Sequence, residues 1–201
     1  MAIQCPGCGR RYDPALFEFG RTIHCTCGAR VGREQRIGSS PANQEPRFIA
    51  DAMLGRVARW LRTLGYDTVF NDAIADFELV RRALLENRIL LTRDRRIPEE
   101  WRIDNCLILD TRGTQDQLAE VVSALGLPHP DRLFTRCRHC NVELEPIPRA
   151  EVADGVPTRV LERTDDFFHC PECERVYWRG SHTERMSKLI DRVFDKAEAS
   201  G

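Results

Sequence analysis

Eight of the nine cysteines occur in four close pairs, and this spacing is typical of metal binding. The pairs form two sets, one made of Cys5, Cys8, Cys25 and Cys27 and the other of Cys137, Cys140, Cys170 and Cys173. Four thiolates brought together in this way bind Zn²⁺ tetrahedrally. The second set is the more regular, because the first ends in C-x-C and has His24 beside it as an alternative ligand. The sequence therefore predicts two structural zinc sites.

A disulfide framework is the alternative use of paired cysteines. The thiols cluster locally and the first residues lead straight into a cysteine pair without a secretory signal, so we expect zinc and a reducing cytoplasm instead. Structural zinc stabilises small folds without doing chemistry. The function must therefore be sought in other residues.

Charge and hydropathy limit the partners of the chain. Its formal net charge is −1 and becomes more negative once the paired cysteines ionise, so only a local patch can bind nucleic acid. All but two of the 30 basic residues are arginine, which suits phosphate, although a GC-rich genome produces the same bias. There is no run of about 18 apolar residues, so we expect no membrane span.

Composition divides the chain into four segments. Residues 1–36 form the first zinc unit, 37–46 a polar linker, 47–130 a larger core, and 131–201 a second zinc unit with a tail helix. The first unit can bury a small core made of Tyr12, Leu16, Phe17, Phe19 and Ile23. In the second unit, the stretch between the cysteine pairs has room for a β-hairpin.

Strand and helix patterns alternate through residues 47–130. We expect strands at 48–50, 67–70, 88–92 and 106–109, and helices over 53–64, from Asp76 and from Thr114, the last with a capping box. This alternation predicts an α/β fold with a parallel sheet flanked by helices. Cys106 falls on a strand, so we expect it to be buried and not a metal ligand.

Aspartates follow the expected strands. Asp51, Asp72, Asp94 and Asp110 come within two residues of a strand end, and Asp76 begins a helix. Ligands bind at the carboxyl ends of parallel strands, and carboxylates gathered there repel one another unless a cation neutralises them. A Mg²⁺ or Mn²⁺ ion would also support phosphodiester hydrolysis. The alternative is that Asp51 and Asp76 cap helices and that the others begin turns.

Several arginines are placed to meet phosphate. Arg93 and Arg95 flank Asp94, whereas Arg56, Arg59 and Arg62 lie opposite the apolar stripe of the first helix, where we expect a solvated face. Basic and aromatic residues mix around the second zinc site, as they do where proteins stack bases, although surface and core residues of a ribbon give the same mixture. These residues are Arg136, Arg138, His139, Arg175, Tyr177, Trp178, Arg179, His182 and Arg185.

Three motifs in order resemble the Mut-seven C-terminal RNase family, a compact branch of the PIN-like nucleases with an attached zinc ribbon. The first runs from Phe48 to Arg62 and continues with Leu64-Gly65-Tyr66-Asp67. The second is Ile89-Leu90-Leu91-Thr92-Arg93-Asp94-Arg95, and the third comprises the second cysteine set with Val176-Tyr177-Trp178-Arg179-Gly180-Ser181-His182. The resemblance covers about residues 47–186 and leaves the first zinc unit outside.

The resemblance implies metal-dependent cleavage of RNA by a PIN-like core. It assigns Asp51 and Asp94 as metal-binding carboxylates and Asp76 as a further acid, and Asp110 has the right place for a fourth. The cofactors would be two structural Zn²⁺ and a catalytic Mg²⁺ or Mn²⁺. Candidate substrate-binding residues are Arg56, Arg93, Arg95, Arg179 and His182. The zinc ribbons would position RNA, and the N-terminal one could dock a protein partner.

Two other functions are compatible with parts of the sequence. A non-catalytic adaptor would bind RNA or protein through its zinc ribbons. This function does not explain why carboxylates follow successive strands. An aspartyl phosphotransferase would use Asp51 as a nucleophile. Enzymes of the haloacid dehalogenase group usually carry a second Asp two residues later, and this chain has Met53 there.

Overall fold

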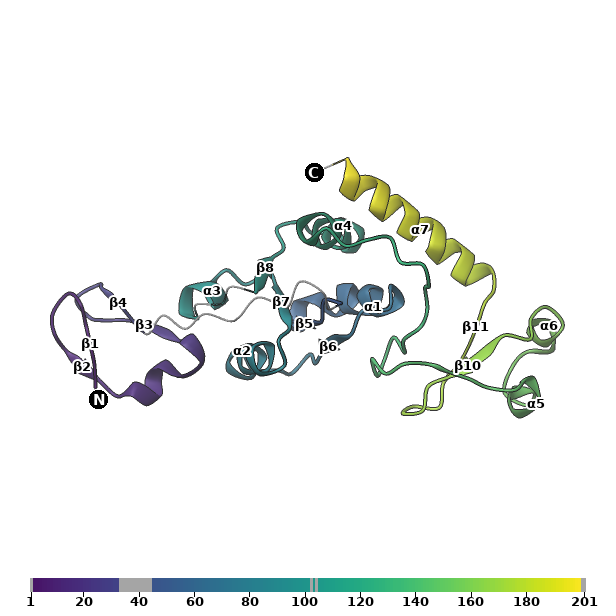
Figure 1. Ribbon diagram of the computed structural model, residues 1–201, viewed down its shortest axis with the longest axis horizontal. Coiled ribbons are helices and arrows are strands. Elements are labelled where there is room, and N and C mark those ends of the chain that lie inside the picture. Colours follow the sequence, from purple (N-terminus) through teal and green to yellow (C-terminus); the bar gives the residue numbers. More distant parts are fainter. Residues whose placement is uncertain (1, 33–44, 102, 104, 200–201) are drawn as a thin grey trace. The chain divides into compact units, whose positions relative to one another are not determined.

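The computed structural model describes residues 2–32, 45–101, 103 and 105–199 (Figure 1). It divides into two compact units, Met1–Gly55 with Val69–Asp110 and Arg56–Thr68 with Thr111–Gly201. Most of the linker predicted over residues 37–46 lies outside the described residues. None of the helices in the described part combines the length and hydropathy needed to cross a membrane.

A four-stranded parallel sheet forms the centre of the first unit, which confirms the predicted α/β class. The strands are β5 (Phe48–Ala50), β6 (Thr68–Phe70), β7 (Ile89–Thr92) and β8 (Cys106–Ile108), in the order β6-β5-β7-β8. Ile49 pairs with Leu90, and Leu91 pairs with Leu107. All of β5 and the middle of β7 are fully buried, as expected of parallel strands covered on both faces.

Three short helices belong to this sheet region, and the longest packs on it. They are η2 (Ala52–Leu54), α2 (Asp76–Leu85) and α3 (Arg96–Glu100). Helix α2 lies beside the sheet (Figure 1). It buries Leu79, Val80 and Ala83 in one cluster with Ile49 and Leu90 of the sheet. The same cluster includes Ile97 and Trp101 at and after α3. The apolar spacing that predicted α2 therefore corresponds to its sheet-facing side.

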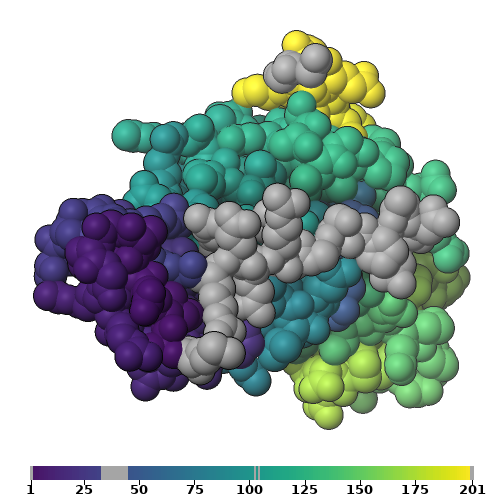
Figure 2. Space-filling view, turned by 60° about the vertical axis from the view of Figure 1, so that its left-hand side comes forward, coloured from purple at the N-terminus to yellow at the C-terminus, as the bar shows by residue number. Residues whose placement is uncertain are grey.

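The N-terminal zinc unit, residues 2–32, is also part of the first unit. It comprises two hairpins, β1 (Ile3–Gln4) with β2 (Arg11–Tyr12) and β3 (Thr22–His24) with β4 (Arg30–Gly32), joined by η1 (Pro14–Gly20). Its residues gather into one compact lobe in the space-filling view (Figure 2). The Thr22 hydroxyl hydrogen-bonds the carbonyls of Glu99 and Glu100, both at 2.9 Å, and so ties this lobe to α3.

Two residues predicted for the core of this lobe lie elsewhere. Phe17 is buried with Val31 as expected, but Leu16 is exposed and Phe19 packs against the sheet cluster. The chain kinks inside η1, where Phe19 takes a left-handed backbone conformation with φ of 52°. That kink turns the Phe19 ring toward Phe77 of α2, with ring centroids 5.4 Å apart. An aromatic residue predicted to be internal thus joins the lobe to the sheet region.

The second unit combines helices with a small antiparallel sheet. Its elements are α1 (Gly55–Thr63), α4 (Thr114–Leu125), β9 (Glu145–Pro146), α5 (Arg149–Val152), α6 (Thr158–Leu161), β10 (Phe167–His169), β11 (Val176–Trp178) and α7 (Ser181–Glu198). The sheet order is β11-β10-β9, and α4 packs along the predicted tail helix α7 (Figure 1). The expected hairpin is extended, because α5 and α6 separate the paired strands β9 and β10.

The capping box predicted at Thr114 is absent from this helix. Gly113 is the N-cap of α4, and Thr114 is already helical. The Gln117 side chain donates to the carbonyl of Thr111 at 3.0 Å instead of reaching back to the N-cap. The helix therefore begins one residue earlier than the motif predicted, and Gln117 is bound to the loop before the helix.

Arg62 is buried, so the prediction of a solvated face was wrong for this residue. Only 4% of it is exposed. Its Nε donates to the carbonyl of Thr68 at 2.9 Å, and Nη1 donates to the carbonyls of Arg138 and His139 at 2.9 and 2.8 Å. Burial lowers the pKa of the guanidinium. Arg62 therefore fastens α1 to the first cysteine pair of the second zinc unit.

Replacing Arg62 with Met should destabilise the second unit by about 3 kcal/mol. The substitution keeps the aliphatic stem but leaves three carbonyls without a charged donor. Arg59→Met, on an exposed position of the same helix, should change stability by about 0.5 kcal/mol or less. Urea unfolding followed by circular dichroism measures both, and equal effects of the two variants would contradict the role given to Arg62.

Candidate functional site

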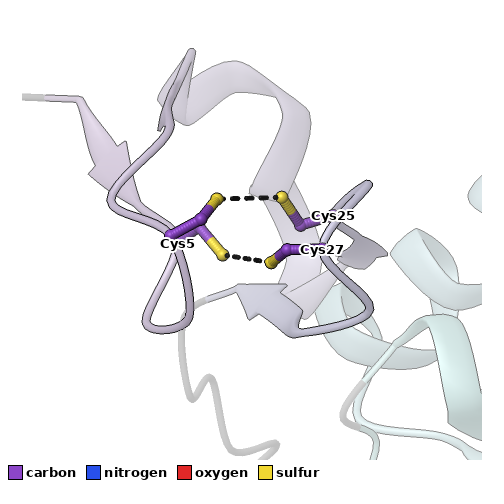
Figure 3. A group of neighbouring side chains, drawn as sticks. Cys5, Cys25 and Cys27 are labelled. Carbon is purple, nitrogen blue, oxygen red and sulfur yellow. Dashed lines mark hydrogen bonds between the residues drawn. The ribbon is translucent and has the colours of Figure 1, made fainter.

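The two predicted cysteine sets each come together in space. The ligand atoms of Cys5, Cys8, Cys25 and Cys27 lie within 4.8 Å of one another, and so do those of Cys137, Cys140, Cys170 and Cys173. Figure 3 shows Cys5, Cys25 and Cys27 directing their sulfur atoms toward a common centre. All nine cysteines are free thiols, so the disulfide alternative has no support. His24 points outward in β3 and is not part of the first group.

All four cysteine turns share one backbone pattern. The first cysteine of each pair accepts a backbone hydrogen bond from a residue three or four positions later, at 2.8 to 3.0 Å. That later residue always has a left-handed φ, and the four are Gly9, Gly28, Asn141 and Glu174. The C-x-C pair closes its turn one residue earlier, at Gly28, than the three C-x2-C pairs do. The shorter spacing thus produces the same kind of metal-binding turn.

Sulfur distances and thiol ionisation both fit Zn²⁺. Tetrahedral zinc with Zn–S bonds of about 2.3 Å places its sulfurs about 3.8 Å apart. The Cys5–Cys27 and Cys8–Cys25 sulfurs are 3.5 Å apart. Hydrogen bonds from the Cys27 backbone and the Tyr12 hydroxyl lower the pKa of Cys25 to about 5. Cys25 therefore favours the thiolate form, which is the form that binds Zn²⁺.

The second group shows the same preference. Its Cys137 and Cys173 sulfurs are 3.8 Å apart. Burial alone would raise the pKa of Cys137, but the Tyr177 hydroxyl at 3.1 Å and backbone N–H groups lower it to about 6. Burial and neighbouring thiols raise the pKa of Cys140 to about 12. Four close thiols can all ionise only when a cation offsets their charge, which is what structural Zn²⁺ does.

We expect two zinc ions per chain and no contribution to them from Cys106. This residue lies in β8 against the sheet cluster, and burial raises its pKa to about 12. Cys106→Ala should therefore leave the zinc content at two. Elemental analysis of protein purified without chelator measures this. A content of one zinc per chain in the parent would contradict the N-terminal site. Loss of zinc on Cys106→Ala would show that Cys106 is a ligand.

Two of the predicted acids, Asp51 and Asp110, flank the carboxyl end of β7. The Asp51 N–H donates to the carbonyl of Leu91 at 3.0 Å, and the Leu109 N–H donates to that of Thr92 at 2.8 Å. These bonds extend the strand pairing beyond β5 and β8. They place Asp51 on one side of the end of β7 and Asp110 on the other. The sequence prediction that strand ends bring acids to one edge is consistent with this register.

Asp51 is held firmly at that edge. It is 6% exposed, and its carboxylate accepts hydrogen bonds from the Thr92 hydroxyl, the Arg93 N–H at 3.1 Å and the Met53 N–H at 2.8 Å. The Met53 bond makes Asp51 the N-cap of η2, which is the alternative role considered for it. The cap uses Oδ1, whereas Oδ2 faces β7. Asp51 therefore combines a capping role with a fixed position at the sheet edge.

Thr92 links Asp51 to Asp94. Its hydroxyl donates to Asp51, and its Oγ1 accepts the Asp94 N–H at 2.9 Å. The Asp94 carboxylate is bound by Arg96 through bonds of 2.6 and 3.1 Å, which lower its pKa. The Arg96 side chain is 78% exposed and therefore free to leave. Neither Thr92 nor Arg96 was chosen from the sequence, although Thr92 lies inside the second motif.

The other two predicted acids are exposed. Asp76 is the first residue of α2, whose N-cap is Ala75, so the alternative capping role does not apply to it. Asp110 pairs with Arg95 at 2.6 Å in an exposed ion pair. Among the described residues, no three carboxylates lie within 4.8 Å of one another. The edge thus offers two neighbouring acids, Asp51 and Asp94, with two more at its rim.

The predicted substrate-binding residues fall into separate places. Arg93 and Arg95 belong to the sheet edge, and Arg93 Nε is buried without a hydrogen-bond partner among the described residues. Arg56 is exposed on α1. Arg179 and His182 line a cavity in the second zinc unit together with Arg138. The cavity was not predicted as such, because its lining combines residues between 132 and 144 with Phe168 and with residues between 177 and 186.

Comparison with known proteins identifies the family. No curated protein matches the chain, and neither does any solved structure. The sequence model of the Mut7-C RNAse domain matches residues 46–190. This span contains the whole parallel sheet, the strand-end acids and the second cysteine group, and it leaves out the first cysteine group. Because the match covers well over half of the chain and includes the predicted motifs, the protein belongs to the Mut7-C RNAse domain family.

Proposed function

We propose that the protein is a metal-dependent ribonuclease that hydrolyses RNA phosphodiester bonds at the carboxyl end of its parallel sheet. The observation that carries this proposal is the link through Thr92, which joins the buried carboxylate of Asp51 to the start of the Asp94 turn. Family membership supports a nuclease-type function. The metal, the RNA substrate and the roles of single residues are our proposals.

The residues at the sheet edge fit a hard divalent cation. The candidate metal ligands here, the carboxylates of Asp51 and Asp94, offer only oxygen atoms, which suit Mg²⁺ or Mn²⁺ and not the softer metals. Mg²⁺ is commonly held by only one or two carboxylates and completes its shell with water and substrate phosphates. The pair Asp51 and Asp94 satisfies that need, and Asp76 and Asp110 lie outside it as supporting acids.

Each group at the edge has a distinct task in this proposal. A bound cation would lower the pKa of a water molecule and offset the charge on the phosphate. Asp51 holds a fixed carboxylate because three donors orient it, and Asp94 supplies a second carboxylate once Arg96 moves away. Arg93 and Arg95 would bind the RNA phosphate in this proposal, Arg95 after leaving its exposed ion pair with Asp110.

The zinc units would support this core rather than react. The second one would position RNA, and the N-terminal one would contact RNA or a protein partner. A specific observation favours a rival adaptor function, because Arg96 already neutralises Asp94. A phosphotransferase is disfavoured, since both carboxylate oxygens of Asp51 are engaged and the residue is buried.

The proposal is tested by the metal dependence of cleavage. Zinc-loaded protein is dialysed free of other divalent cations and incubated with end-labelled single-stranded RNA, with Mn²⁺, with Mg²⁺ or with neither. We expect products only when Mn²⁺ or Mg²⁺ is present. Cleavage at the same rate without added cation would overturn the metal role, and binding without cleavage under every condition would favour the adaptor.

A further inference from the structure

The second zinc unit contains a cavity of about 390 Å³. Its size lies within the range of about 300–1,000 Å³ that is usual for small-ligand sites. Its walls come from the chain before, within and just after the first cysteine pair of this unit, from β10 and β11, and from the start of α7. The lining combines aromatic side chains, among them Phe134, Trp178 and His182, with the arginines Arg132, Arg138 and Arg179.

Aromatic rings form one part of the lining. Trp178 and His182 meet edge to face, with centroids 6.2 Å apart and planes at 80°. Phe134 lines the cavity from a left-handed backbone conformation with φ of 62°, which is rare for a bulky residue. Its N–H donates to the carbonyl of Thr63 at 2.9 Å and so holds this conformation. Such strain persists where the surrounding structure requires a particular side-chain position.

Unpaired positive charge forms the other part. Arg132, Arg138 and Arg179 line the cavity, and within the described part of the chain none of them forms an ion pair. The acidic residue in the lining, Glu143, is engaged by Arg136 at 3.0 Å. Arg138 packs over the Trp60 ring, 6.0 Å from its centroid, and its Nε is buried without a hydrogen-bond partner among the described residues. A buried donor of this kind is costly unless a ligand supplies an acceptor.

We propose that this cavity binds one unpaired nucleotide of single-stranded RNA, an inference that rests on the proposed ribonuclease function. A nucleotide combines a flat aromatic base with an anionic phosphate. The base would stack on Trp178 and its aromatic neighbours, and the phosphate would be bound by Arg179 and Arg138. An acidic peptide would match the charge but would leave the aromatic walls without a flat partner.

Single-stranded RNA is selected over a duplex by the same geometry. A base inside an A-form helix is already stacked and cannot enter a cavity without being pulled out. Duplex RNA of the same sequence should therefore compete poorly with the single strand. A free nucleoside monophosphate should compete too, but only at much higher concentration, because it lacks the neighbouring phosphates that Arg132 and other arginines can reach.

The test measures RNA binding without Mg²⁺ or Mn²⁺, so that cleavage plays no part. Fluorescence anisotropy of a labelled single-stranded RNA of about ten nucleotides reports affinity for the full-length, zinc-loaded protein. Trp178→Leu should weaken binding by roughly 5- to 100-fold, and Trp178→Phe should keep most of it because a ring remains. Trp178 also packs beside the core of its unit, so zinc content and circular dichroism check its folding.

Arg179→Gln provides a second variant that does not disturb the core, because Arg179 is exposed. If Arg179 contacts a phosphate, its loss should lower the slope of log Kd against log salt by about 0.7. Arg163→Gln removes another exposed arginine of the same unit that does not line the cavity, and it should leave the slope unchanged. Parent-like binding by both Trp178→Leu and Arg179→Gln would overturn the proposal.

Other results also decide the matter. Equal binding of single-stranded and duplex RNA would contradict a base pocket, and displacement of RNA by an acidic peptide would reassign the cavity to a protein.

Failure of the nucleotide-pocket proposal can be distinguished from failure of the ribonuclease proposal. If cleavage depends on Asp94 but neither binding nor cleavage depends on Trp178 or Arg179, only the nucleotide pocket is refuted. If RNA binding depends on the pocket residues but the rate of cleavage is the same in Asp94→Asn, only the catalytic assignment is refuted.

Discussion

Asp94→Asn is expected to lower the rate of RNA cleavage by at least about 100-fold while the zinc content stays at two. The amide has the same size but lacks the charge that holds a hard cation. Loss of a residue that merely supports a metal ligand already costs about 10- to 100-fold, so loss of the ligand should cost more. The Asn Oδ1 can still accept the Arg96 N–H, a bond of 2.9 Å in the parent, so the turn should survive. Single-turnover cleavage with Mn²⁺ measures the effect.

Arg96→Gln separates the metal role of Asp94 from a structural one. Arg96 competes with any cation for the Asp94 carboxylate, and removal of its charge should keep or increase the rate at low Mn²⁺. If the ion pair instead serves only to hold the turn, Arg96→Gln and Asp94→Asn should damage the protein alike. Asp51 is less suited to this comparison, because its carboxylate also caps η2. A parent-like rate for Asp94→Asn would contradict the assignment directly.

Cys170→Ser is expected to remove one zinc ion and unfold the small sheet of the second unit. Cys170 is fully buried between β10 and β11, and its N–H donates to the carbonyl of Arg175 at 3.0 Å. Structural zinc contributes about 10–16 kcal/mol of apparent binding energy, which is comparable to the whole stability of a domain at about 5–15 kcal/mol. A sheet of strands only two or three residues long cannot replace that contribution.

Elemental analysis and hydrogen exchange together measure this outcome. Zinc should fall from two to one per chain, and amide protection should be lost over β9, β10 and β11. Protection in β5 and β7 should remain, because the parallel sheet has its own buried cluster. Cys106→Ala is the matched control and should keep both ions. Full protection of β10 in a one-zinc protein would show that this sheet does not depend on the metal.

Patterns that are local in sequence predicted most of the fold. The close cysteine pairs, the apolar runs of β5 and β7 and the spacing of α2 depend on neighbouring residues, and the structure confirms them. The strand-end positions of Asp51 and Asp110 followed from the parallel order, because that order sends successive carboxyl ends to one edge. Local sequence patterns thus predicted the strands and the acidic residues that follow them at the sheet edge.

Contacts between distant segments could not be predicted in the same way. Arg62 has the pattern of a surface residue, yet three carbonyls from two other segments surround it. Phe19 has the pattern of a core residue, yet a left-handed backbone turns it toward Phe77. The cavity beside Trp178 and the pairing of Asp94 with Arg96 likewise depend on side-chain positions that no periodicity encodes. These are the features that tertiary packing decides.

Direct Mn²⁺ binding tests the central claim, that Asp94 and Asp51 hold a divalent cation. Electron paramagnetic resonance of free Mn²⁺ gives the bound fraction as the zinc-loaded parent, Asp94→Asn and Arg96→Gln are titrated. We expect the parent to bind at least one Mn²⁺, Asp94→Asn to bind it much more weakly, and Arg96→Gln to bind it equally or more tightly. Equal Mn²⁺ binding by the parent and Asp94→Asn, or none by either, would contradict the central claim.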